Sequence, residues 1–166
     1  TNTLKFEFND DVKATVLNVL PPMRAGDIAV KTGLATANKR WCEIDFLTHE
    51  AKAAKNIHVL GDSIQVAPAM PKSGHMANQH GKTCAAAVVA LLSGKQPNAL
   101  PIYTNTCYSF VSAEDAMHVA SVHRYDAAQK TMLPVPGSGG VSSASNELEG
   151  GYAMAWARNI WADTLA

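Results

Sequence analysis

The chain has 166 residues, which is enough for one domain with a sizeable core. Lysine and arginine together number 14, as do aspartate and glutamate, so the charge balance gives no argument for a nucleic acid or an anionic membrane surface as partner. The longest apolar stretch, residues 84–92, is far too short to span a membrane, so no transmembrane segment is expected, and no signal-peptide pattern is expected at the start.

The first part of the chain is predicted to hold short strands and one helix. Apolar and polar residues alternate over residues 4–8, which predicts a strand, and Asp10 marks the turn that follows it. A second apolar run at residues 16–20 ends at two prolines. Apolar residues at helical spacing over 24–33 predict a helix, with Gly33 at its C-terminal end.

The next segment predicts a buried strand that ends in a sharp turn. Ile57, Val59 and Leu60 form a short apolar run, and Gly61 lets the backbone turn without a Cβ clash. Asp62 would then lie at the C-terminal end of a strand, where open α/β folds place ligand-contacting groups. The alternative is that Asp62 only shapes the turn, because aspartate is common there for its local hydrogen bonds.

A proline-rich loop leads from this turn to an alanine-rich helix over residues 74–92. Ser73 and Gly74 stand where the helix begins, and the N–H groups of a first helical turn lack helical partners. Such N–H groups can face an electronegative ligand atom. The small side chains along this helix permit a close approach by a neighbouring element or a flat ring.

The last part of the chain predicts a small antiparallel sheet followed by a helix. The strands are expected at residues 102–111, 117–125 and 131–135, a Gly/Ser loop at 137–146 and the helix at 146–166. The predicted fold class is therefore α/β plus α+β. No G-x-G-x-x-G follows any predicted strand, so the dinucleotide-binding fingerprint is absent from this sequence.

Several motifs resemble one family closely. They are GDSIQVAPAMPKSGHMANQHG, GKTCAAAVVALLSGKQP, PIYTNTCYS and YAMAWARNIWADTLA, with NVLPPMRAG and RWCEIDFLT upstream. Together they resemble the flavoprotein subunits of flavocytochrome c sulfide dehydrogenase, which are related to the sulfide:quinone reductases. The PMPKSG-type and TNTCYS-type segments are the most specific of these motifs.

The resemblance implies a fold and a domain organisation. The chain would be the C-terminal portion of a FAD-binding flavoprotein with two dinucleotide-binding domains. Residues 1–96 would be the C-terminal part of the FAD/NAD(P)-binding-like region, and residues 97–166 a flavocytochrome c sulfide dehydrogenase-type C-terminal domain. An N-terminal half with the missing fingerprint would be a further partner, and the isolated fragment is expected to be inactive.

The resemblance also implies an activity. The full protein would bind FAD, oxidise sulfide as its substrate and pass electrons to a c-type cytochrome subunit, in the periplasm. One alternative is a sulfide:quinone reductase-like protein with the same chemistry and another acceptor. A second alternative is a non-catalytic fragment or interaction module that binds no flavin.

The cofactor site implied by the resemblance lies in the 61–74 segment. Asp62 would bind the ribityl chain of FAD. Lys72 is either an ordinary solvated lysine or a fixed cation that neutralises charge on the reduced flavin. The full set of expected cofactor-binding residues is Gly61, Asp62, Met70, Pro71, Lys72, Ser73 and Gly74.

Cys107 is the expected catalytic residue. In the resembled family, the cysteine of the TNTCYS-type segment pairs with one from the missing half, forming a redox disulfide over the flavin. Sulfide attacks this disulfide, and the released thiolate passes two electrons to the flavin. The alternative is a small, buried strand residue. Cys42 and Cys84 are expected to be structural.

Metal and haem are not expected on this chain. Neither the cysteines nor the six histidines have a metal-ligand spacing, and C-x-x-C-H is absent. On the last predicted helix, Tyr152 and Trp156 share a face while Trp161 is offset from it. These aromatic residues are either core or part of a subunit interface.

Overall fold

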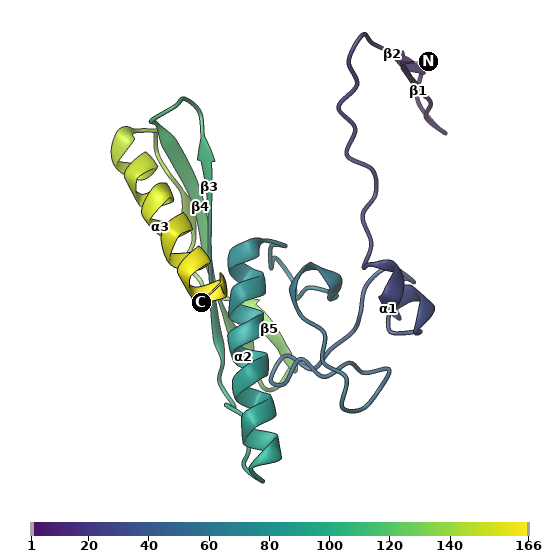
Figure 1. Cartoon of the computed structure of the whole chain (residues 1–166), viewed down its shortest axis with the longest axis vertical. Helices are drawn as coiled ribbons and strands as arrows, with labels where there is room; N and C mark the ends of the chain where they lie inside the picture. The colour runs from purple at the N-terminus through teal and green to yellow at the C-terminus, as the bar shows by residue number, and fades with distance from the viewer. Residues whose placement is uncertain (1, 166) are drawn as a thin grey trace.

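The computed structural model describes residues 2–165 and begins with an extended arm. Strands β1 (Thr3–Leu4) and β2 (Val12–Lys13) form a two-stranded hairpin, and an irregular stretch leads to helix α1 (Asp27–Lys31). Figure 1 shows the arm running away from the rest of the molecule. The prediction of a strand over residues 4–8 is wrong beyond Leu4, since so small a hairpin has no other layer against which to bury its apolar residues.

Helix α1 and the irregular segment that follows it hold a small satellite core. Ala25, Ala29 and Cys42 are buried together. Gly33 has φ +76° just after α1, as predicted for the residue that ends this helix.

The predicted buried strand at residues 57–60 is wrong. Ile57 is 45% exposed and Leu60 42% exposed, and the segment forms only an isolated bridge between His58 and Glu50. Residues 49–51 lie alongside, but they add only the hydrogen bonds from the Val59 N–H to the His49 carbonyl and from the Ala51 N–H to the Ile57 carbonyl, so the pairing is too short to form a strand. The segment leads directly into a short 3₁₀ turn, η1 (Gly61–Ser63).

Helix α2 (Gly74–Leu92) has the predicted bounds. Ser73 is its N-cap, and the Ser73 hydroxyl accepts a hydrogen bond from the Met76 N–H. The buried residues of α2 recur every three or four positions and form one stripe: Met76, His80, Cys84 and Ala87.

The C-terminal part is an antiparallel sheet with helices packed against it, as predicted. The sheet order is β3–β4–β5, with β6 pairing with β4. Cys107 of β3 lies opposite Val119 of β4. The bounds are β3 (Ile102–Phe110), β4 (Ala116–Asp126), β5 (Thr131–Pro134), β6 (Gly140–Val141) and α3 (Glu147–Leu165). Strand β6 falls inside the predicted Gly/Ser loop.

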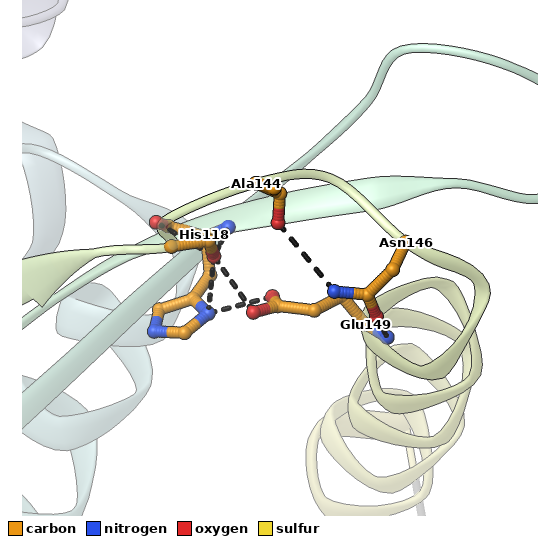
Figure 2. A network of polar contacts seen from close by, with 5 residues as sticks. His118, Ala144, Asn146 and Glu149 are labelled. Atoms are coloured by element: carbon orange, nitrogen blue, oxygen red, sulfur yellow. Dashed lines mark hydrogen bonds and ion pairs between the residues drawn. The ribbon is translucent and has the colours of Figure 1, made fainter.

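Helix α3 lies along the β3–β4 hairpin, beside α2 (Figure 1). Asp163 near the end of α3 forms an ion pair with Lys82 at 2.8 Å and accepts a hydrogen bond from Asn78, both on α2. Near its start, α3 is fastened to β4 by a contact between His118 and Glu149, which are labelled in Figure 2.

The main core lies where α2, the sheet and the 44–70 segment meet. Its fully buried centre includes Ile64, Met76, Tyr103 and Met132. The described residues therefore form the α+β part of the predicted fold class, whereas the predicted α/β part is not seen among them. They contain no parallel sheet, and their one parallel contact is the isolated bridge between Cys42 and Ile64. Among these residues, no helix has both the length and the apolar character needed to cross a bilayer.

Candidate functional site

The N-terminus of α2 presents unused hydrogen-bond donors on an open surface. Within residues 2–165, the backbone N–H groups of Gly74 and His75 form no hydrogen bond. A Cβ built on Gly74 would have no heavy atom within 4 Å, so the space above this residue is open. A groove of about 510 Å³ follows the same face of α2, along Gly74, Ala77 and Gly81. This surface can receive a flat, electron-rich group close to the helix backbone.

The turn that carries Asp62 lies beside this helix. Gly61 has φ +69°, and a Cβ on it would lie 3.4 Å from the Ala77 Cβ. The Gly61 N–H donates to Nδ1 of His80 on α2 at 3.3 Å. The Asp62 side chain is exposed, and its carboxylate has no hydrogen bond or ion pair within the described residues. Asp62 and the α2 N-terminus thus face solvent from adjacent elements.

A buried cluster of two histidines and a tyrosine contacts the Gly61 turn through His80. The Tyr103 hydroxyl donates to the Phe46 carbonyl at 3.0 Å and lies 2.9 Å from Nε2 of His49. The rings of His49 and His80 are 4.9 Å apart. Burial is the main cause that lowers the pKa of His49 to about 4 and that of His80 to about 3, so both rings are neutral at pH 7. A neutral His80 keeps the lone pair that accepts the Gly61 N–H.

Lys72 is hydrogen-bonded to the backbone of the turn that carries Asp62. Its ammonium donates to the carbonyls of Asp62 and Ile64, each at 2.7 Å, and lies 3.8 Å from the Trp41 ring centroid. Desolvation lowers the pKa of Lys72, and the negative charge of Asp62 opposes that shift. Two of the three ammonium donors are therefore used within the protein, which makes Lys72 more than a solvated surface lysine. Its proposed role toward a reduced flavin stays a prediction.

The remaining residues expected at the cofactor site differ in exposure. The Met70 side chain is buried in the main core, so a ligand could contact only its backbone. Pro71 is half-buried between Met70 and Lys72. The fold therefore brings Gly61, Asp62, Lys72, Ser73 and Gly74 together and turns the Met70 side chain inward.

Cys107 shares a cavity with the start of α2. The cavity has a volume of about 320 Å³ and is lined by residues of α2, β3 and α3, among them Ser73, Gly74, Cys107 and Trp156. Cys107 is half-buried, and its thiol is free. Helix α2 and strand β3 thus place the proposed catalytic thiol next to the helix N-terminus.

The other two cysteines are buried. Burial raises the pKa of the Cys42 thiol, an effect that Lys72 opposes, and burial also raises the pKa of the Cys84 thiol. Cys84 belongs to the buried stripe of α2, as its expected structural role requires. The described residues hold no group of three or more His, Cys, Asp or Glu side chains that could bind a metal ion.

Three residues around Cys107 were missed by the sequence analysis as parts of this site. Asn105 contacts the Cys107 sulfur, and Nδ1 of His75 accepts the Thr106 N–H at 3.0 Å. Trp156 lines the cavity, and its indole N–H has no hydrogen-bond partner among the described residues. Tyr152 and Trp161 are exposed and are not core. A signal for Asn105 was present, because residues two apart on a strand share a face.

A comparison with known protein families identifies the C-terminal part of the chain. Residues 99–165 match the family model described as "Flavocytochrome c sulphide dehydrogenase, flavin-binding". The match covers less than half of the chain and includes β3 with Cys107, the rest of the sheet and α3. The α2 N-terminus and the Asp62 turn lie outside the matched residues. The segment 99–165 is therefore similar to the flavin-binding domain of flavocytochrome c sulphide dehydrogenase, and the cofactor that this match implies is FAD.

Proposed function

We propose that this chain forms part of the FAD site of a sulfide dehydrogenase, with Cys107 as its catalytic thiol. The observation that carries the proposal is the shared cavity of Cys107 and the α2 N-terminus. Residues 99–165 match a flavin-binding family, and the cavity joins this segment to the N-terminus of α2. The Asp62 turn packs against α2.

The residues present fit a flavin. The unpaired N–H groups of Gly74 and His75 suit the electron-rich pyrimidine edge of an isoalloxazine ring, and the positive end of the α2 dipole favours negative charge there. The exposed carboxylate of Asp62 would accept a hydrogen bond from a ribityl hydroxyl. Lys72 and His80 would hold the Asp62 turn beside the helix, through the hydrogen bonds described above.

The chemistry of sulfide oxidation assigns a role to Cys107. When bound, FAD supplies an acceptor for two electrons. Cys107 would form a disulfide with a cysteine outside residues 1–166, and sulfide would attack one sulfur of that bond. The old S–S bond breaks as a new one forms to the sulfide sulfur, and the other cysteine leaves as a thiolate. A c-type cytochrome would then accept the electrons, in the periplasm.

The test is the Cys107→Ser variant of the complete flavoprotein, with Cys84→Ala as the control. Serine cannot form the disulfide and is not ionised at neutral pH, so Cys107→Ser should keep the visible flavin absorbance and lose sulfide oxidation. Cys84→Ala should keep both, because Cys84 lies in the buried stripe of α2. Full sulfide turnover in Cys107→Ser would remove this residue from the mechanism. Absence of flavin from the wild-type protein would instead support a non-catalytic module.

A further inference from the structure

A buried amide connects Cys107 to the first turn of α2. Asn105 is 3% exposed and lies on the same face of β3 as Cys107. Its Nδ2 is 3.4 Å from the Cys107 sulfur, and its Oδ1 is 3.7 Å from the same sulfur. On the other side, the Ser73 hydroxyl donates to Asn105 Oδ1 at 2.5 Å.

The hydrogen bonds of Ser73 orient this amide. The Ser73 hydroxyl oxygen accepts the Met76 N–H at the start of α2, and its single proton goes to Asn105 Oδ1. With Oδ1 engaged by Ser73, the amide N–H₂ group is directed at the sulfur. An uncharged thiol can donate its S–H to Oδ1, and a thiolate can accept an N–H from Nδ2. One side chain thus serves both protonation states of Cys107.

A second link fixes the strand next to the thiol. Nδ1 of His75 accepts the Thr106 N–H at 3.0 Å, and the His75 ring packs edge-on against Trp156. Strand β3 is at the edge of the sheet, so its outward N–H groups have no strand partner. The start of α2 is therefore fastened to β3 at both Asn105 and Thr106, the two residues that precede Cys107.

The described residues that line the cavity around the Cys107 sulfur include no ammonium, guanidinium or carboxylate group. Besides the thiol, the titratable side chains that line the cavity are His75 from α2 and Tyr108 from β3, and α3 contributes none. Desolvation lowers the pKa of His75, which keeps this ring neutral and able to accept the Thr106 N–H. With no ammonium, guanidinium or carboxylate among the described lining residues, hydrogen-bond donors and the α2 dipole are what can stabilise a thiolate.

We propose that Asn105 is a positioning residue that holds the Cys107 sulfur and stabilises its thiolate through Nδ2, with Ser73 orienting the amide. This role rests on the proposed function of Cys107. The flavin would bind at the N-terminus of α2. The hydrogen bonds of Ser73 and Asn105 therefore couple the position of this helix end to the reactivity of the Cys107 thiol.

The test measures alkylation of Cys107 by iodoacetamide in the reduced, folded protein, at pH 7 and pH 10, by peptide mass spectrometry. Asn105→Leu removes the amide without adding charge, and Thr104→Leu is the control on the opposite, exposed face of β3. Only a thiolate displaces iodide, so Asn105→Leu should react about tenfold more slowly at pH 7 and at the control rate at pH 10, where an ordinary thiol is ionised. Thr104→Leu should react as the wild type does at both pH values.

Two results would overturn the proposal. One is an unchanged rate at pH 7 in Asn105→Leu, and the other is an equal slowing at both pH values, which would indicate altered access. The buried thiols of Cys42 and Cys84 report on folding in the same sample, because they react only if the variant unfolds. If Asn105→Leu unfolds, the Ser73→Ala variant tests the proposal instead. Loss of the orienting hydroxyl should slow the alkylation of Cys107 about threefold at pH 7 and leave it unchanged at pH 10. An unchanged rate at pH 7 would refute the coupling of Ser73 to Cys107 through Asn105. Sulfide turnover of Cys107→Ser is a separate measurement, so this proposal and the proposed function can fail independently.

Discussion

Gly150 allows helix α3 to approach the turn between β3 and β4. A Cβ at this position would lie 1.8 Å from the carbonyl oxygen of Glu114 and 3.5 Å from the ring of Phe110. The neighbouring Gly151 has no atom within 4 Å of a built Cβ, although both glycines lie in the first turns of α3. The absence of one side chain therefore permits the contact between α3 and the hairpin.

Replacing Gly150 with alanine should destabilise the protein by about 1–3 kcal/mol, because backbone atoms must move to admit the methyl group. Gly151→Ala is the matched control and should be neutral or stabilising by up to about 1 kcal/mol, since alanine is the better helix former. Urea unfolding followed by circular dichroism measures both. Equal midpoints for the two variants would show that the contact with Glu114 carries no packing constraint.

Asp62 offers a second test at the scale of one residue. Replacing Asp62 with alanine in the complete flavoprotein should weaken FAD binding, because a ribityl hydroxyl would lose a charge-assisted hydrogen bond worth about 1.5–3 kcal/mol. Titration of the apoprotein with FAD measures the effect, with Asp10→Ala on the N-terminal arm as the control. An unchanged FAD affinity in Asp62→Ala would mean that Asp62 only shapes the turn.

At the scale of the elements, α3 is held on the sheet by a polar network at its first turn (Figure 2). The two Glu149 oxygens accept hydrogen bonds from Nδ1 of His118 at 2.6 Å and from the Ser142 hydroxyl at 2.7 Å. The Ser142 hydroxyl accepts the His118 N–H at 2.8 Å, and Asn146 accepts the Glu149 N–H at 3.0 Å. The network thus ties α3, β4 and the segment after β6 together.

This network predicts an acid-sensitive attachment of α3. The hydrogen bonds from His118 and Ser142 lower the pKa of the Glu149 carboxyl below its ordinary 4.5. Glu149 therefore binds a proton more readily in the unfolded chain than in the folded protein. The stabilisation that ionised Glu149 gives the folded state is complete above pH 4.5, and it is lost as pH falls through the lower pKa of Glu149 in the folded protein. Hydrogen exchange of the α3 amides, measured between pH 6 and pH 3, should show this loss in the wild type.

Glu149→Gln tests the assignment to that carboxyl. The variant should show weaker α3 protection at pH 6 and lack the acid-dependent component attributed to Glu149. Glu147→Gln is the control, because the exposed Glu147 side chain forms no hydrogen bond within the described residues. If Glu149→Gln loses α3 protection with acid just as the wild type does, another group is responsible.

At the scale of the whole molecule, the chain divides into a packed part and an arm that packs against almost nothing. The arm, residues 2–24, carries large apolar side chains in the open, with Phe8 87% exposed and Leu20 94% exposed. Its end is held by Arg40, which donates to the Met23 carbonyl. The packed part begins at Ala25 and contains both hydrophobic clusters.

Deletion of residues 1–20 should therefore shift the melting temperature by only a few degrees, because little apolar area is removed from the folded state. Deletion of residues 147–166, which removes α3 (Glu147–Leu165), should lower the melting temperature strongly, because it uncovers the β3–β4 face and the Cys107 cavity. Thermal unfolding by circular dichroism compares the two. Loss of cooperative unfolding on removal of the arm alone would contradict this division.

The sequence by itself determined the elements with strong local signals. Helix α2, strands β3–β5 and helix α3 lie where alternation, helical spacing and turn residues predicted them, because these patterns repeat within each element. The motif around Cys107 indicated the family that the match over residues 99–165 identifies. The buried strand at residues 57–60 was predicted wrongly, because an apolar run is buried only if another element covers it, and the strand at residues 4–8 was wrong beyond Leu4.

Only the tertiary structure decided which side chains meet. Ser73 and Asn105 are 32 positions apart, and no periodic pattern links them, yet they form the hydrogen bond that joins α2 to β3. The inward side chain of Met70, the use of the Lys72 ammonium by two carbonyls and the place of Trp156 at the thiol likewise depend on how α2 and α3 pack on the sheet. Hydrogen bonding and van der Waals contact act over a few ångströms of space, whereas sequence patterns report only the neighbours that a residue has along its own element.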